Sequence, residues 1–159
     1  MKVGQVLVIA GIAVAGSIAL SFFHPWGDMR AATGNDELLG GANVPTDVRQ
    51  MLEAKCADCH STHTHWPVYG RIAPGSWLME HDVHEGREHL NLSVWQQYDA
   101  DTQIDLLAKI AAVARKDEMP VKQYVWLHPS ARLTSEERQR LAFWAKGESR
   151  RLRSETPQP

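Results

Sequence analysis

The hydrophobic pattern divides the chain into an apolar N-terminal segment and a longer mixed part. No Asp, Glu, Lys or Arg occurs between Lys2 and Asp28, and the run from Val3 to Phe23 is mainly apolar. A helix of about 20 such residues crosses the hydrocarbon core of a bilayer. Residues 1–26 are therefore predicted to form a signal anchor that stays in the membrane as a transmembrane helix.

A cleaved signal peptide is the alternative for this segment. Signal peptides have a shorter apolar core of roughly 7 to 15 residues and a cleavage site with small residues, which Ala13-Val14-Ala15 fits. Cleavage there would leave Gly16 to Phe23 as a second apolar run at the new terminus, so the uncleaved anchor is favoured. Lys2 predicts a cytoplasmic N-terminus, which places everything after Trp26 outside the membrane.

Helical spacing of apolar residues predicts three helices in the remainder. The first begins near Thr46 and leads to Cys56, and the second runs from about Thr102 to Lys116. The third starts at the capping-box sequence 134–137 and is expected to end at Gly147.

Two further segments carry weaker patterns, and no convincing strand alternation is present. Trp77 to Val83 is compatible with a short helix, and Val121 to Leu127 is compatible with extended chain. The expected fold class is all-α.

Composition sets the expected domain limits. Residues 27–43 are rich in Gly, Ala, Asn and acidic side chains and are predicted to be a flexible tether. Residues 44–147 are long enough for one domain, and the polar, proline-ending segment 148–159 is expected to be a disordered tail. The 19 acidic residues outnumber the 17 basic ones, without a concentrated basic face, so a nucleic-acid partner is not expected.

The most specific motif is Cys56-Ala57-Asp58-Cys59-His60, which uses both cysteines of the chain. This is the attachment signature of c-type haem. Each thiol can form a thioether with a haem vinyl group, and the adjacent His60 imidazole can ligate the iron. One covalently attached haem c is the predicted cofactor.

Two other uses of a Cys-x-x-Cys pair compete with haem. The pair could supply half of a zinc site, with His81, His84 or His89 completing the tetrahedron. It could also be a redox dithiol, although the alternating strand and helix context of that site is missing.

Met119 is the candidate for the sixth iron ligand. It follows an amphipathic helix and precedes Pro120, so its thioether can project from a loop. A core gap-filling role is the alternative. The rival ligands are histidines: His63, His65, His81, His84, His89 and His128.

With these motifs in place, the chain resembles the small bacterial haem-binding domain family built around Cys-x-x-Cys-His, over most of residues 44–145. The matching positions are 56–61, 66–69, 72–74, 76–78, 82–83, 86–87, 90–91, 118–120, Tyr124, 127–129 and Leu133. The resemblance implies a c-type cytochrome-like domain, similar to a small class I cytochrome c, wrapped around one haem. It further implies that Cys56 and Cys59 are the thioether anchors, His60 the proximal ligand and Met119 the distal ligand.

The expected haem environment extends this assignment. Ile72-Ala73-Pro74 resembles the loop in which a proline carbonyl accepts a hydrogen bond from the proximal imidazole. The candidate partners of the haem propionates and walls of the pocket are Trp66, Tyr69, Arg71, Trp77 and Arg87.

The expected function is electron transfer, without enzymatic activity, by a single-pass protein of the bacterial inner membrane whose haem domain lies in the periplasm. Its partners would be redox proteins in or at the membrane. If the signal were cleaved, the same domain would be soluble in the periplasm. A haem enzyme or a gas or redox sensor with an open sixth position is the alternative, and a zinc-stabilised interaction module is another.

Overall fold

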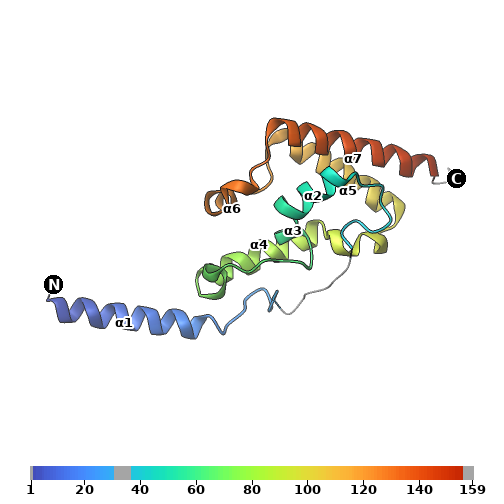
Figure 1. The fold of residues 1–159 in the computed structure, drawn as a ribbon. Helices are drawn as coiled ribbons and strands as arrows, with labels where there is room; N and C mark the ends of the chain where they lie inside the picture. The colour runs from blue at the N-terminus through green and yellow to red at the C-terminus, as the bar shows by residue number, and fades with distance from the viewer. Residues whose placement is uncertain (1, 31–36, 156–159) are drawn as a thin grey trace.

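The computed structural model describes residues 2–30 and 37–155, and within them the chain is entirely helical (Figure 1). The α-helices are α1 (Val3–Leu20), α2 (Thr46–Lys55), α3 (Ala57–His60), α4 (Gly75–His89), α5 (Ala100–Lys116), α6 (Lys122–Leu127) and α7 (Ser135–Glu155). Short 3-10 helices occur at η1 (Val68–Arg71), η2 (Leu92–Gln97) and η3 (Pro129–Ala131). The predicted all-α class is confirmed for the described residues.

Helix α1 extends away from the rest of the molecule (Figure 1). Its 18 residues have a mean hydropathy of 2.2, and none of them is buried. At a rise of 1.5 Å per residue it is about 27 Å long, close to the hydrocarbon thickness of a bilayer. By length and composition α1 can cross a membrane. A signal sequence near the N-terminus has a similar length and apolar composition, so α1 fits either one.

The most extensive helix pair is formed by α5 and α7, which lie side by side (Figure 1). Small residues such as Ala111 and Ala145 are buried between larger ones such as Leu107 and Leu141, so the two backbones approach closely. The capping box predicted for α7 is present, because the Glu137 amide donates to Thr134 Oγ1 and the Thr134 amide donates to Glu137 Oε2.

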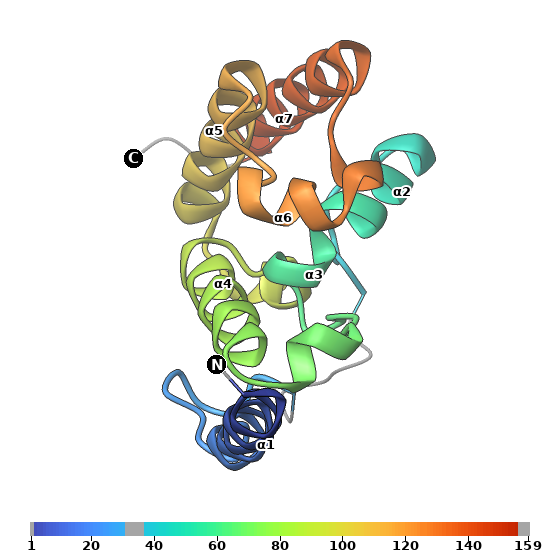
Figure 2. The ribbon, with the colours of Figure 1, turned by 90° about the vertical axis from the view of Figure 1, so that its left-hand side faces the viewer.

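The other half of the domain carries the cysteine motif. Helix α2 buries Val48, Met51 and Leu52 and leads directly into α3. The four-residue α3 packs against α4, and Figure 2 shows it between α4 and α6. The motif is thus enclosed by elements from both ends of the domain sequence.

Two expected local structures differ from those observed. Helix α4 is longer than the expected Trp77–Val83 at both ends. It buries Met79 and Val83, but its histidines interrupt the apolar periodicity, so the sequence pattern did not show its full length. The expectation of extended chain at Val121–Leu127 is wrong, since 122–127 form α6. A six-residue segment is too short for its period to separate helix from strand.

The expected end of the domain is also corrected. Helix α7 does not stop at Gly147 but continues to Glu155, so disorder from residue 148 is not observed up to that point. The reason is Glu148, which is only 4% exposed, accepts a hydrogen bond from the Asn43 amide and pairs with Arg151 at 2.6 Å. Residues 156–159 lie outside the described residues.

The expected tether, residues 27–43, is likewise only partly supported. Residues 31–36 lie outside the described residues, but Leu38 and Leu39 are buried in the core, and the Leu39 amide donates to the Leu92 carbonyl at 2.9 Å. The packed domain therefore begins before the predicted Val44. Two adjacent leucines form no period, so the pattern of the sequence did not reveal them.

The Glu148 contact predicts a pH-dependent stability. Burial raises the pKa of Glu148, but hydrogen bonds from Arg151 and Asn43 lower it more, so the pKa lies below its ordinary value of 4.5. Replacing Glu148 by Gln is expected to cost about 1–3 kcal/mol at neutral pH. This difference from wild type should shrink as the pH falls below 4.5, because protonation removes the same contribution from the wild-type protein.

Thermal or denaturant unfolding at several pH values measures this effect. Glu155→Gln is the matched control, because Glu155 also pairs with Arg151 but is exposed, and it should change stability little. An equal loss of stability in the Glu148→Gln and Glu155→Gln variants would contradict the assigned role of Glu148.

Candidate functional site

A cavity of about 710 Å³ lies between the α3–α4 side of the domain and α5 with the chain that follows it. This volume is in the range of pockets that enclose a whole small-molecule ligand. Much of its wall is aliphatic and is supplied by Leu52, Leu90, Leu92, Leu106, Ile110, Val113, Leu133 and Leu141. Cys56, Cys59 and His60 line the same cavity, and so does Met119.

The His60 ring is fixed by two backbone carbonyls at the end of α4. Its Nδ1 lies 2.8 Å from Gly86 O and 3.0 Å from Leu90 O, so Nδ1 carries the proton and donates to them. Gly86 O also accepts the Leu90 amide at 2.9 Å, so this carbonyl bonds both the residue that caps α4 and the His60 ring. Burial lowers the pKa of His60, so the neutral ring keeps Nε2 free as a metal-binding atom.

The predicted acceptor for His60, the Pro74 carbonyl, is therefore not the one observed. Pro74 precedes α4, and its carbonyl accepts a hydrogen bond from the Leu78 amide at 3.2 Å. The acceptors come from the opposite end of the same helix, because α3 crosses α4 near Gly86.

This crossing depends on the missing side chain of Gly86. A Cβ at residue 86 would lie 2.5 Å from the Cys59 carbonyl oxygen and 3.0 Å from Cys59 Cβ. Glycine in a helix interior costs stability, and it is found where another backbone approaches closely. Gly86 thus lets α4 reach the cysteine motif and place its carbonyl beside His60.

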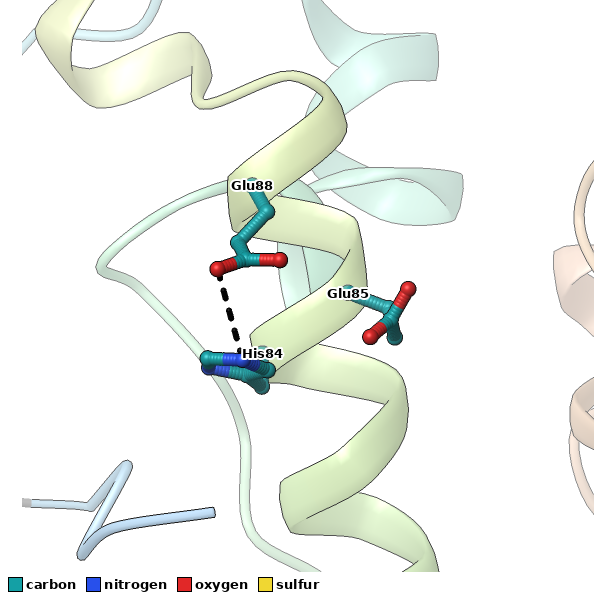
Figure 3. Close-up of side chains that lie close together, drawn as sticks. All are labelled: His84, Glu85 and Glu88. Atoms are coloured by element: carbon teal, nitrogen blue, oxygen red, sulfur yellow. Dashed lines mark ion pairs between the residues drawn. The ribbon is translucent and has the colours of Figure 1, made fainter.

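Both cysteines are free, and burial raises the pKa of each thiol to about 12. Among the described residues, the cluster spaced to hold a metal ion is His84, Glu85 and Glu88 on α4 (Figure 3). Neither cysteine belongs to that cluster, so the geometry gives the zinc alternative no support.

Met119 reaches the cavity from the link between α5 and α6. Asp117 ends α5 in the left-handed conformation at φ 57°, and the Glu118 amide still bonds back to Val113 O at 3.2 Å. The Arg138 guanidinium holds the Asp117 carboxylate at 2.9 Å. These contacts position the chain immediately before Met119.

The structure separates the rival histidines into two groups. His81 and His89 line the same cavity as His60 and Met119. His63 and His65 line a second cavity of about 380 Å³, and His84 lies 3.5 Å from Glu88 (Figure 3). His128 is hydrogen-bonded to Tyr69 at 2.7 Å. Met119, His81 and His89 therefore remain as candidate second ligands.

The six residues expected in the wider haem environment do not line this cavity: Trp66, Tyr69, Arg71, Pro74, Trp77 and Arg87. Arg87 instead holds the loop after the motif, since its Nε donates to Ser61 O at 2.8 Å and its Nη2 to Thr64 Oγ1 at 3.3 Å. Trp77 donates to Phe23 O beyond α1. Chemistry alone could not separate such supporting residues from wall residues.

A polar group at the cavity edge was missed by the sequence reasoning. The Tyr124 hydroxyl donates to Asp58 Oδ2 at 2.6 Å, and the His65 amide donates to Asp58 Oδ1 at 2.8 Å. Burial and the neighbouring Asp58 carboxylate raise the pKa of Tyr124. The Tyr124 ring also stacks on His128 with centroids 4.4 Å apart. The available signals were the position of Asp58 inside the motif and a Tyr just after Met119.

Comparison with known proteins identifies the family. A sequence model of the family described as Haem-binding domain matches residues 15–147. This is most of the chain, so the protein belongs to the haem-binding domain family. No curated protein matches the chain, and no solved structure matches it either.

The close crossing at Gly86 yields a prediction. Gly86→Ala should push α4 away from α3, weaken the hydrogen bonds of His60 and destabilise the domain by about 1–3 kcal/mol. Gly147→Ala is the matched control, because nothing lies within 4 Å of a Cβ at that helical position. It should stabilise the protein by up to about 1 kcal/mol through helix propensity. Thermal unfolding of both variants measures the contrast, and a stabilised Gly86→Ala would contradict the crossing.

Proposed function

We propose that this protein is a membrane-anchored monohaem c-type cytochrome that carries single electrons between redox partners on the periplasmic side. One arrangement carries the proposal: His60, with Nδ1 committed to two carbonyls, lines one large apolar cavity together with both cysteines of the motif and Met119. Membership of the haem-binding domain family supports the cofactor.

The residues of the cavity fit a covalently attached haem. The aliphatic wall suits a macrocycle, and the cysteine thiols lie on that wall within one turn of His60. Bound haem supplies a one-electron iron couple whose potential depends on its axial ligands. Cys56 and Cys59 would hold it through thioethers, His60 Nε2 would ligate the iron, and Met119 would supply the second axial ligand.

The environment of His60 suits a permanent iron ligand. The carbonyls of Gly86 and Leu90 orient the ring and increase the basicity of Nε2, as such partners do for metal-bound imidazoles. The ring also lies at the C-terminal end of α4, where the helix dipole favours positive charge. A second ligand from Met119 would close the iron to substrates, which favours electron transfer over enzymatic or sensing chemistry.

The proposed location follows from α1. The helix exposes its whole apolar surface, so it needs a lipid environment unless it is removed after export. Retention would make the protein a single-pass protein of the inner membrane, with the haem domain outside and redox proteins in or at that membrane as partners.

Covalent attachment is tested by mass. Protein expressed with haem-maturation machinery should gain the mass of one haem that resists denaturation and acid extraction. Cys56→Ala or Cys59→Ala should lose one thioether, and the double variant should release all haem under denaturing conditions. Denaturing mass spectrometry measures this, and loss of haem from the wild-type protein would contradict attachment.

The second ligand is tested by optical spectra of the ferric protein. Methionine on ferric haem gives a weak charge-transfer band in the far red, which should be present in wild type and absent in Met119→Ala. His81→Ala and His89→Ala are the matched controls from the same cavity and should keep the band. Rapid stoichiometric carbon monoxide binding by the ferrous wild type would instead favour an open iron and an enzyme or sensor.

A further inference from the structure

Exposed large apolar side chains of the domain gather on a few elements. Beyond the end of the anchor segment at Phe23, they are Val68, Ile72, Leu78, Trp126, Leu127 and Phe143. Val68 lies in η1, Ile72 follows it directly, Leu78 lies near the start of α4, and Trp126 and Leu127 lie in α6. Val68 is 78% exposed and Trp126 is 87% exposed, so contact of these apolar side chains with water is unfavourable in free energy.

These elements lie on the side of the domain from which α1 projects. In Figure 1, α1 extends to the left, and η1, the start of α4 and α6 form the left edge of the domain. Figure 2 views this side directly, with α1 nearly end-on and α6 and the first turns of α4 towards the viewer. A bilayer crossed by α1 would therefore face them.

Specific contacts fix the domain against the end of α1. The Ala73 amide donates to Ser21 Oγ at 2.8 Å, and Ser17 Oγ donates to the Ala73 carbonyl. The first residues after α1 bind α4, since the Trp77 indole donates to Phe23 O at 2.7 Å and His24 Nδ1 lies 2.6 Å from Glu80 Oε1. Contact at Ser17, one turn inside α1, places Ala73 at the depth of the bilayer interface.

The charge of this side suits a lipid surface. Residues 66–79 and 119–128 contain no Asp or Glu, although the chain has 19 acidic residues. Their cations are Arg71 on η1 and Lys122 on α6, both exposed. Basic residues near a membrane are attracted to anionic lipid headgroups, and Trp is enriched at the membrane interface.

We infer that the surface formed by Val68, Ile72, Leu78, Trp126 and Leu127 rests in the interface of the bilayer that α1 crosses. The inference rests on the proposed anchor role of α1 and assigns lipid as the occupant of this surface. Because α6 also lines the haem cavity through Gln123 and Tyr124, this docking holds the cavity next to the membrane in one orientation.

The test measures the depth of spin labels in the full-length, haem-loaded protein in nanodiscs of mixed phosphatidylcholine and phosphatidylglycerol. Haem attachment would occupy Cys56 and Cys59, so a cysteine introduced at residue 68 or 126 can be labelled selectively. Unsubstituted protein treated identically reports residual labelling. For each spin label, the rate of collision with oxygen, which concentrates in lipid, is compared with the rate of collision with a water-soluble nickel chelate. A higher ratio of the two rates means that the label lies deeper in the bilayer.

Phe143→Cys is the matched control, because Phe143 is 75% exposed but lies on α7, and Ile12→Cys reports insertion of α1. For the labels introduced by Val68→Cys and Trp126→Cys, the ratio of collision with oxygen to collision with the nickel chelate should be several-fold higher than for the label at residue 143. Aqueous labels at 68 and 126 with a lipid-exposed label at 12 would overturn the docking and leave the anchor intact. An aqueous label at 12 would overturn the anchor and the docking together, and labels shielded from both reagents would indicate a protein partner and overturn lipid.

Discussion

The site depends on the contact between two backbones at Gly86 and Cys59. Because residue 86 has no Cβ, α4 crosses α3 closely enough for its terminal carbonyls to accept the Nδ1 proton of His60. That bond selects the tautomer, orients the ring and leaves Nε2 available to a metal. A larger residue at position 86 would separate the motif from the helix that orients it, even with both cysteines and the histidine unchanged.

Sequence reasoning predicted the elements that carry strong local signals. The apolar run of α1, the faces of α2 and α5 and the capping box of α7 all depend on neighbouring residues, and the structure contains them. What the pattern could not show depends on distant pairs. The bonds of His60 to Gly86 and Leu90, the Asn43 to Glu148 contact and the Tyr124 to Asp58 contact join residues 26 to 105 positions apart.

The same distinction explains why the side chains expected in the haem environment do not line the cavity. Arg87 and Tyr69 were selected for their side-chain chemistry, but Arg87 braces the loop after His60 and Tyr69 binds His128. Pro74 was placed by similarity to a loop, whereas its position at the start of α4 puts it at the wrong end of that helix. Helix α4 makes two sets of contacts. Its first half binds the segment after α1, and its last turn orients His60.

The α5–α7 pair has a consequence for the order in which the protein matures. Its buried residues, such as Leu107 and Leu141, belong to a core cluster against which Cys56 is only partly buried and which does not include Cys59. A four-residue helix such as α3 has no stability of its own. Under the proposed function, α5 and α7 can pack together before haem is attached, while the thiols of the motif are still accessible. Occupation of the cavity by that haem would then complete the packing of α3 and α4 and make the chain more resistant to proteases.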